Sequence, residues 1–148
     1  MKILLTGSNG MVGKNILEHN SANNYYFLTP SSKELNLLNY QDVKSYIAFH
    51  QPEFIIHAAG KVGGIHANIK EPVSFLVDNL DMGRNIIMAA KENNIKNLLN
   101  LASSCMYPRD AVNPLSENLI LKGELEPTNE GYAIAKIMST RLCEYIVK

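Results

Sequence analysis

Short apolar runs alternate with longer segments of helical spacing along this chain. Three runs predict buried parallel strands, because each is apolar without strict alternation and stops at a turn or helix signal: Ile3 to Thr6, Phe54 to Ala58 and Leu98 to Leu101. Tyr25 to Leu28 is a weaker strand candidate. The segments between these runs repeat apolar residues every three or four positions, as amphipathic helices do.

Two of the helical segments are long. We expect one helix from Pro72 to Asn93 and another from Gly131 to Lys148, with Ile134, Met138 and Leu142 on one stripe of the second. The alternation of strands and helices predicts the α/β class: a Rossmann-like, doubly wound parallel sheet with helices on both faces and the first strand central. Ligands of such sheets bind beyond the carboxyl ends of the strands.

A helix in the position of the last one normally crosses over to another parallel strand. No strand follows it here, so we expect one domain over residues 1–148 that is incomplete at its C-terminal end. Leu98 to Leu101 would then form a sheet edge, and the apolar stripe of the last helix would be uncovered. Both features predict poor solubility or self-association.

Composition removes several classes of function. The chain has 148 residues with 14 basic and 14 acidic side chains, a balance that points to neither nucleic acid nor an anionic membrane as a partner. We find no signal sequence and no run of membrane-spanning length. Two cysteines are too few for a disulfide framework or a zinc site. We therefore expect a cytoplasmic protein without a metal site.

A glycine-rich turn follows the first strand. Its residues are Gly7, Ser8, Asn9, Gly10, Met11, Val12 and Gly13. The first glycine permits a tight turn, the second lets backbone N–H groups approach a pyrophosphate, and the third lets the helix lie close to the sheet. A glycine turn without a ligand is the simpler alternative. Its place between a strand and an amphipathic helix predicts a dinucleotide site.

The residues after the second strand bear on the choice of dinucleotide. An acidic residue here would accept the ribose 2′-OH of NAD. The chain instead has Ser31, Ser32 and Lys33, whose hydroxyls and ammonium suit the 2′-phosphate of NADP(H). Glu34 would favour NAD if the turn is longer, and Lys33 could simply be solvated. The expected cofactor contacts also include three residues at the ends of later strands: Ala58, Ala59 and Leu101.

Tyr132 and Lys136 lie four residues apart on the last predicted helix and therefore share one face. An unperturbed tyrosine titrates near pH 10, and a nearby ammonium lowers that value. The pair predicts that Tyr132 is a general acid or base. A Y-x-x-x-K spacing also arises by chance, as a tyrosine beside an ordinary surface lysine.

A second element supports this pair. Ala102 to Pro108 follows the predicted strand Leu98 to Leu101 at its carboxyl end. The hydroxyl of Ser103 can hydrogen-bond the carbonyl oxygen that Tyr132 protonates. The glycine loop, this hydroxyl and the Tyr–Lys pair thus occur in the order, and at the strand and helix ends, that a reductase site needs.

Two further residues lie near the expected pocket. We place Lys61 beside the cofactor, just past the third strand, or as a charge at the rim of the site. His66 follows the pair Gly63-Gly64 and matches no required role.

Five strings of residues resemble a known family. They are Gly10 to Gly13, Glu34 to Leu38, Lys61 to Ile65, Ser103 to Pro108 and Leu125 to Lys136. Through them nearly the whole chain is similar to the N-terminal part of an extended short-chain dehydrogenase/reductase. Within that group it resembles the GDP-L-fucose synthases, which epimerise and reduce GDP-4-keto-6-deoxy-D-mannose. The strings around Lys61 and Tyr132 are far more specific than the glycine loop.

The resemblance implies a role for each candidate catalytic residue. Cys105 would exchange protons at the carbons that flank the 4-keto group, and Tyr132 would protonate the C4 oxygen as hydride arrives from NADPH. Ser103 would hold that oxygen, while Lys136 would tune Tyr132 and bind the nicotinamide ribose. The keto group acidifies the neighbouring C–H bonds and accepts the hydride, so one site can perform both steps. A small buried residue is the alternative role for Cys105.

The resemblance also implies parts that these residues lack, namely a catalytic histidine and a C-terminal lobe that binds GDP and the sugar. We therefore expect the chain to bind cofactor weakly and to turn over little or no substrate. A homodimer through the two long helices is implied as well. Two alternatives are open: an NAD-dependent sugar-nucleotide 4-epimerase or dehydratase, and a non-catalytic domain that binds a dinucleotide or a partner.

Overall fold

The computed structural model describes residues 1–147. Their contacts divide the chain into two compact units. One unit comprises residues 1–60 and 81–101, and the other comprises residues 61–80 and those from 102 onward. None of the helices among residues 1–147 is long and apolar enough to span a membrane.

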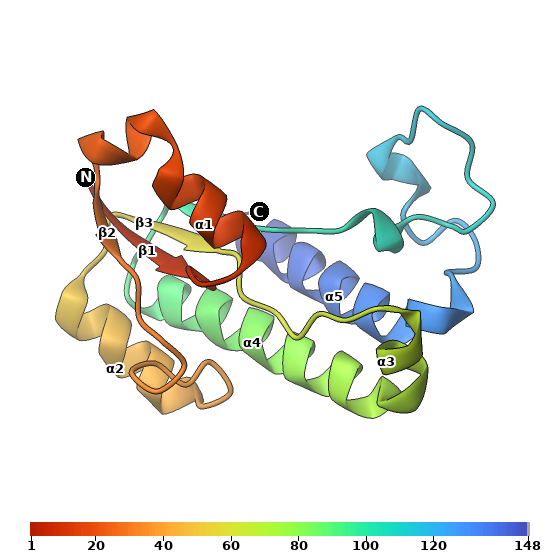
Figure 1. Ribbon diagram of the computed structural model, residues 1–148, viewed down its shortest axis with the longest axis horizontal. Coiled ribbons are helices and arrows are strands. Elements are labelled where there is room, and N and C mark those ends of the chain that lie inside the picture. The colour runs from red at the N-terminus through yellow and green to blue at the C-terminus, as the bar shows by residue number, and fades with distance from the viewer. Residues whose placement is uncertain (148) are drawn as a thin grey trace. The chain divides into compact units, whose positions relative to one another are not determined.

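A four-stranded parallel sheet forms the centre of the first unit (Figure 1). Its strands are β1 (Lys2–Thr6), β2 (Tyr26–Leu28), β3 (Phe54–His57) and β4 (Leu98–Asn100), in the order β2-β1-β3-β4. This order, with the first strand inside the sheet, confirms the predicted Rossmann-like class. All four predicted strands are present, although Tyr25, Ala58 and Leu101 lie just outside them.

Helices cover both faces of this sheet. Figure 1 shows α1 (Met11–Glu18) on one face, and α2 (Tyr40–His50) with the C-terminal half of α4 (Pro72–Glu92) on the other. A short 3-10 helix, η1 (Asn20–Asn24), connects α1 to β2. The amide of Asn85 in α4 donates a 2.9 Å hydrogen bond to the carbonyl oxygen of Leu37, which holds α4 to the segment before α2.

The core of this unit explains the apolar runs of the sequence. Leu4 and Leu5 of β1, Ile55 of β3, and Ile47 of α2 have no exposed surface. An inner parallel strand is covered on both faces, so it reads as a continuous apolar run rather than an alternating one. Leu99 of β4 is 47% exposed, and β4 is the edge of the sheet among the described residues, as predicted.

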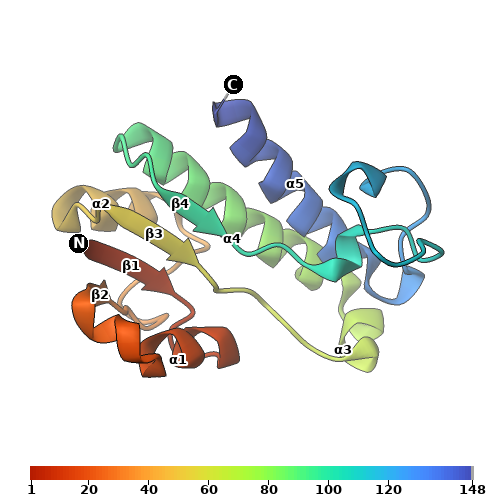
Figure 2. The same cartoon turned by 90° about the horizontal axis from the view of Figure 1, so that it is seen from above.

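The second unit is helical. It contains α3 (Ile65–Lys70), the N-terminal part of α4, α5 (Glu130–Val147) and three short 3-10 helices: η2 (Ser104–Met106), η3 (Glu117–Leu119) and η4 (Pro127–Asn129). The two long helices match their predicted ranges to within one residue at each described end. A side chain at Gly131 would lie 3.1 Å from the carbonyl oxygen of Pro72, so α5 starts directly against the start of α4 (Figure 2). The sequence analysis did not predict α3.

Candidate functional site

Gly7 controls the turn that leaves β1. Its φ of 72° lies in the left-handed region, which favours glycine. A Cβ atom on Gly7 would lie 2.6 Å from the Ala59 nitrogen and 2.7 Å from the Ala58 carbonyl carbon, so no side chain fits there. The structure therefore brings Ala58 and Ala59, both predicted cofactor contacts, against the glycine loop.

The other two glycines shape the start of α1. Gly10 precedes the helix, with its N–H donated to the Gly7 carbonyl oxygen at 3.0 Å. A Cβ atom on Gly13 would collide with that same oxygen and lie 2.6 Å from the Ser8 Cα. The third glycine thus lets α1 pack on the loop itself, where the sequence predicted packing on the sheet. Since α1 has no side-chain cap and no acidic residue in its first turn, its N-terminus is suited to an anion.

A buried hydrogen bond joins the carboxyl ends of β1 and β3. The Thr6 hydroxyl lies 2.7 Å from Nδ1 of His57, and both residues are 2% exposed. The Thr6 oxygen also accepts a 3.4 Å bond from the Ala59 N–H. His57 therefore has a structural role, fixing the strand ends beneath the loop.

In the turn after β2, Ser31 hydrogen-bonds the acidic side chain of Glu34. Both the N–H and the hydroxyl of Ser31 donate to the Glu34 carboxylate at 2.8 Å. These bonds hold the pKa of Glu34 below its usual range. Ser32 and Lys33 are exposed, and Lys33 has no ion-pair partner within residues 1–147. The carboxylate that would favour NAD is engaged by Ser31, one of the three predicted phosphate-binding residues, while the other two, Ser32 and Lys33, face solvent.

The four predicted catalytic side chains meet in the second unit. Ser103 precedes η2 and hydrogen-bonds the Tyr132 phenol. The Cys105 thiol is close enough for its charge to act on Tyr132. The ammonium of Lys136, a buried residue one turn further along α5, lies 5.8 Å from the centre of the Tyr132 ring.

The direction of the Tyr132 shift differs from the expectation. Burial raises the pKa of the phenol, the Cys105 charge raises it further, and the Ser103 hydrogen bond opposes both. Burial also lowers the pKa of the Lys136 ammonium. The predicted lowering of the Tyr132 pKa by Lys136 is wrong for this structure, because burial dominates and the ammonium lies over the ring face. A phenol is protonated at neutral pH with or without this shift, and the raised pKa makes Tyr132 a weaker acid in this structure.

Asn129 contacts Cys105, a role that the sequence analysis missed. Its side-chain amide donates a 3.1 Å hydrogen bond to the Cys105 Sγ, while the Cys105 N–H donates to the Ser103 hydroxyl at 3.3 Å. Glu126 caps η4 by accepting bonds from the N–H and hydroxyl of Thr128, which fixes the turn that carries Asn129. The available signal was the place of Asn129 three residues before Tyr132, within the most specific string.

Lys61 is an anchor. Its ammonium binds Glu71 at 2.9 Å, Asp78 at 3.6 Å and the Ser74 hydroxyl. The Glu71 hydrogen bond chiefly raises the pKa of Lys61. Asn79 holds the backbone of the same residue on both sides, through its Oδ1 and Nδ2. These contacts tie the loop before α3 to α4 and favour the reading of Lys61 as a charge at the rim.

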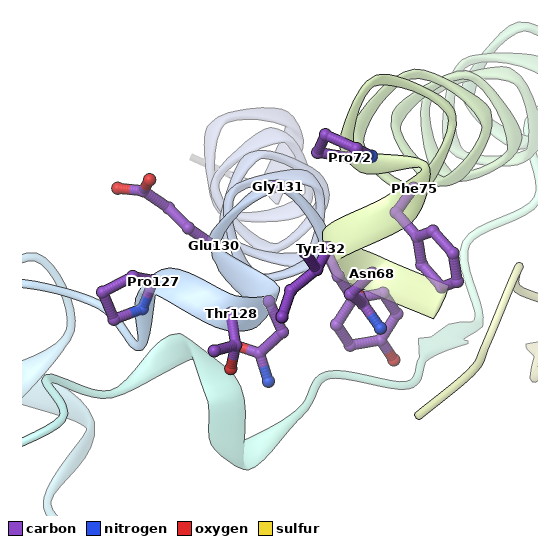
Figure 3. A pocket seen from close by; sticks show the side chains of 10 residues that line it. Asn68, Pro72, Phe75, Pro127, Thr128, Glu130, Gly131 and Tyr132 are labelled. Carbon is purple, nitrogen blue, oxygen red and sulfur yellow. The ribbon is translucent and has the colours of Figure 1, made fainter. Parts of the chain in front are cut away.

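A cavity of about 230 Å³ opens at the start of α5 (Figure 3). Its lining residues are Asn68, Ile69, Pro72, Phe75, Pro127, Thr128, Asn129, Glu130, Gly131 and Tyr132. Figure 3 shows the side chains of Asn68, Phe75 and Tyr132 gathered on one side, with Glu130 pointing away. The lining contains no Lys or Arg, and His66 is exposed on α3 outside it. No cluster of metal-ligating side chains occurs within residues 1–147.

Residues 3–148 match the model of the family described as "NAD dependent epimerase/dehydratase family". The chain belongs to this family. The match covers both the glycine loop of the first unit and the group of candidate catalytic side chains in the second.

Relatives of this epimerase/dehydratase chain are named for GDP-sugars. It is 64% identical over 146 residues to the GDP-L-colitose synthase of Yersinia pseudotuberculosis, covering 99% of this chain and 47% of that protein. It is 46% identical over 147 residues to the GDP-L-fucose synthase of Azorhizobium caulinodans, with the same coverage. The chain thus spans about half the length of these relatives.

Solved structures of proteins with similar sequences share this fold. The structure described as "MlghC, GDP-mannoheptose C4 reductase from Campylobacter jejuni with NADP bound" has a TM-score of 0.91 and 30% identity. The match covers 97% of this chain and 46% of that chain. A second structure, named DdhaC, has a TM-score of 0.93 and 39% identity over 97% of this chain and 42% of its own.

We predict that Ser103→Ala moves the Tyr132 titration to higher pH in this epimerase/dehydratase chain, because the substitution removes the hydrogen bond that lowers the phenol pKa. Ultraviolet difference titration against Tyr132→Phe isolates this one phenol from the other tyrosines. Ser104→Ala, at the adjacent exposed serine, is the control and should leave the midpoint unchanged. An unmoved or lowered midpoint in Ser103→Ala would contradict the assigned contact.

Proposed function

We propose that this chain is the cofactor-binding part of an NADPH-dependent GDP-sugar epimerase/reductase of the GDP-L-fucose synthase type, in nucleotide-sugar biosynthesis. The observation that carries the proposal is the meeting of a thiol, Cys105, and a protonated phenol, Tyr132, with Ser103 and Lys136 in one cluster. Epimerisation needs a group that removes and returns protons at carbon, and reduction needs a proton donor at oxygen. The GDP-sugar names of the relatives support the substrate class.

Each residue of the cluster has a task in this proposal. Cys105 removes a proton from a carbon beside the 4-keto group, and a second acid on the other face, the histidine that the resemblance implies, supplies the new proton there. Ser103 holds the C4 oxygen, and Tyr132 donates its proton to that oxygen. When bound, NADPH supplies the hydride. Lys136 binds the nicotinamide ribose and compensates the phenolate that Tyr132 leaves behind.

The cofactor would bind to the first unit. We propose contacts from the glycine loop, from Ala58, Ala59 and Leu101, and from the turn Ser31 to Lys33. Three features support this: the close approach at Gly7, the uncapped start of α1, and the engaged Glu34 carboxylate. A single cofactor-binding domain over residues 1–148 and a cytoplasmic location stay predictions.

The strongest rival is a 4-epimerase or dehydratase that retains NAD. Two observations speak against it: the Cys105 thiol beside Tyr132, and the bonding of Glu34 to Ser31. A non-catalytic dinucleotide-binding domain is the other alternative, and it leaves the clustering of four acid–base and hydroxyl groups without a purpose. The nature of the bound or preferred cofactor separates these possibilities.

We predict that Lys33→Ala weakens NADPH binding about tenfold and leaves NADH binding unchanged, because only NADPH carries a 2′-phosphate for the ammonium to bind. Nucleotide fluorescence titration of the chain measures both affinities. Lys96→Ala, at another exposed lysine of the first unit, is the control and should alter neither. Tighter binding of NADH than of NADPH by the unaltered chain would refute the cofactor assignment.

The two half-reactions should separate in a chimera of residues 1–148 with the remaining half of the Azorhizobium caulinodans relative. With GDP-4-keto-6-deoxy-D-mannose and NADPH in D₂O, we expect Tyr132→Phe to slow NADPH oxidation by about 10²-fold or more while deuterium still enters the sugar. Cys105→Ser should abolish deuterium uptake beside the keto group.

Cys143→Ser is the matched cysteine control for this experiment and should retain both activities. If Cys105→Ser exchanges deuterium at the rate of the unaltered chimera, the role of Cys105 is wrong. If the isolated 148 residues reduce the sugar as fast as the chimera, the expectation of weak activity is wrong.

We further propose that a second copy of the chain covers the apolar faces of α4 and α5 in the second unit. Val73 and Val77 of α4 are 72% and 43% exposed, and Ile134 and Met138 of α5 are 37% and 52% exposed. Exposed apolar side chains in such a group mark an association surface.

We predict that Met138→Lys shifts the chain toward monomer in sedimentation velocity, because a charge within an apolar interface is costly to bury. Val112→Lys changes an equally apolar side chain that is 80% exposed on a loop, and it should not alter association. A monodisperse monomer for the unaltered chain would exclude the dimer.

A further inference from the structure

Asn129 makes a single side-chain hydrogen bond in the structure, and its partner is a sulfur atom. The amide Nδ2 lies 3.1 Å from the Cys105 Sγ. The amide Oδ1 is buried and has no hydrogen-bond partner within the described residues. A buried carbonyl oxygen without a donor costs stability, so this side chain is not placed for the benefit of the fold.

We propose that Asn129 is a positioning residue for Cys105: its amide N–H aims the sulfur at the substrate carbon and stabilises negative charge on it. The inference rests on the proposed function and assigns a role to a residue outside the Ser103, Cys105, Tyr132 and Lys136 set. It follows from which atom of the amide faces the sulfur, since an N–H donor stabilises the thiolate and a carbonyl oxygen would repel it.

The place of Asn129 in the chain strengthens the inference. It ends η4, and the next residue begins α5, the helix that carries Tyr132. One rigid turn therefore sets the sulfur and the phenol relative to each other. A negative sulfur in turn raises the pKa of Tyr132. The amide that contacts the sulfur therefore lies directly before the helix that carries the phenol.

The proton and the electron pair are both accounted for when Cys105 acts as the base. The thiolate forms an S–H bond as the C–H bond beside the keto group breaks, and the electron pair of that bond moves into the enolate. A second acid on the opposite face then protonates the enolate carbon, and the Cys105 S–H loses its proton to solvent before the next turnover; the resemblance assigns that second acid to a histidine outside these residues. The phenol proton remains available for the C4 oxygen during the later hydride step.

Other titratable groups on the neighbouring elements do not compete for the sulfur. Glu126 of the η4 cap is bound to Thr128, which holds the Glu126 pKa low. Glu130, at the start of α5, points away from the cavity (Figure 3). Arg109, which follows η2 and acts on Glu126, is paired with Asp110 and Glu124. The ammonium of Lys136 lies over the Tyr132 ring. The Asn129 N–H is the donor that the structure places on the Cys105 Sγ.

The test is the pH profile of Cys105 alkylation by iodoacetamide, followed by mass spectrometry in a Cys143→Ser background, where Cys105 is the one remaining thiol. Asn129→Asp keeps the size of the side chain and replaces the donor with a carboxylate. We expect about tenfold slower alkylation at pH 7 and a profile displaced to higher pH, because the thiolate is the reactive form. Asn118→Asp adds the same charge at an exposed asparagine of η3 and should match the background.

A purely structural role gives a different result. If Asn129→Asp only loosens the packing around Cys105, alkylation becomes faster at every pH and the profile keeps its midpoint. An unchanged rate and midpoint would equally overturn the proposal. Thermal unfolding of each variant confirms that the comparison is made on folded protein.

The assay needs neither cofactor nor sugar nucleotide, so it separates this proposal from the proposed function. Slower alkylation in Asn129→Asp, together with failure of NADPH binding in the Lys33 experiment, would keep the Asn129 role and reject the reductase. Normal NADPH binding with unchanged alkylation would keep the proposed reductase and reject the role of Asn129. In the chimera, we expect Asn129→Asp to slow deuterium uptake more than NADPH oxidation.

Discussion

The backbone at Gly7 lies so close to Ala58 and Ala59 that no side chain fits between them. This contact sets the ends of β1 and β3 level, and the buried bond between Thr6 and His57 holds them there. Because the strands are parallel, the loops that follow them leave from one edge of the sheet. The packing of Gly13 on the loop then brings the start of α1 to the same edge. The nucleotide-binding features of the first unit all depend on this constraint.

In the second unit, burial and hydrogen bonds have opposing effects on the ionisation of the candidate catalytic side chains. Burial makes both Tyr132 and Lys136 less prone to ionise, which disfavours a phenolate and an ammonium alike. The hydrogen bond from Ser103 counters that tendency at Tyr132. The protonation of the phenol is therefore set by burial and by a few directed contacts within a half-buried group of side chains.

The fold was largely predictable from the sequence because its signals are local. A run such as Ile3 to Thr6 is apolar throughout because both faces of β1 are covered, and α4 and α5 are long enough to show their period. The helix α3 has six residues, too few for a periodic signal, and was missed. The glycines from Gly7 to Gly13 marked the turn between β1 and α1 at its observed place.

The grouping of the candidate residues was easier to predict from the sequence than the direction of the pKa shift. Ser103, Cys105, Tyr132 and Lys136 lie in one group, and their catalytic roles stay predictions. The direction of the Tyr132 shift depends on burial, which residue spacing does not report. The proposed role of Asn129 depends on which way one amide faces. The ion pairs of Lys61 depend on Glu71 at the end of α3 and on Ser74 and Asp78 of α4, which come together only on folding.

The bond between Ser31 and Glu34 holds an acidic side chain in the turn after β2. An acidic side chain of the kind that reads a bare ribose is already encoded beside the proposed cofactor turn, and it is held within that turn by one hydroxyl and one N–H. Loss of the hydroxyl would leave the carboxylate bound by the N–H alone, without creating any new charge. One small side chain therefore sets how this carboxylate is presented at the end of β2.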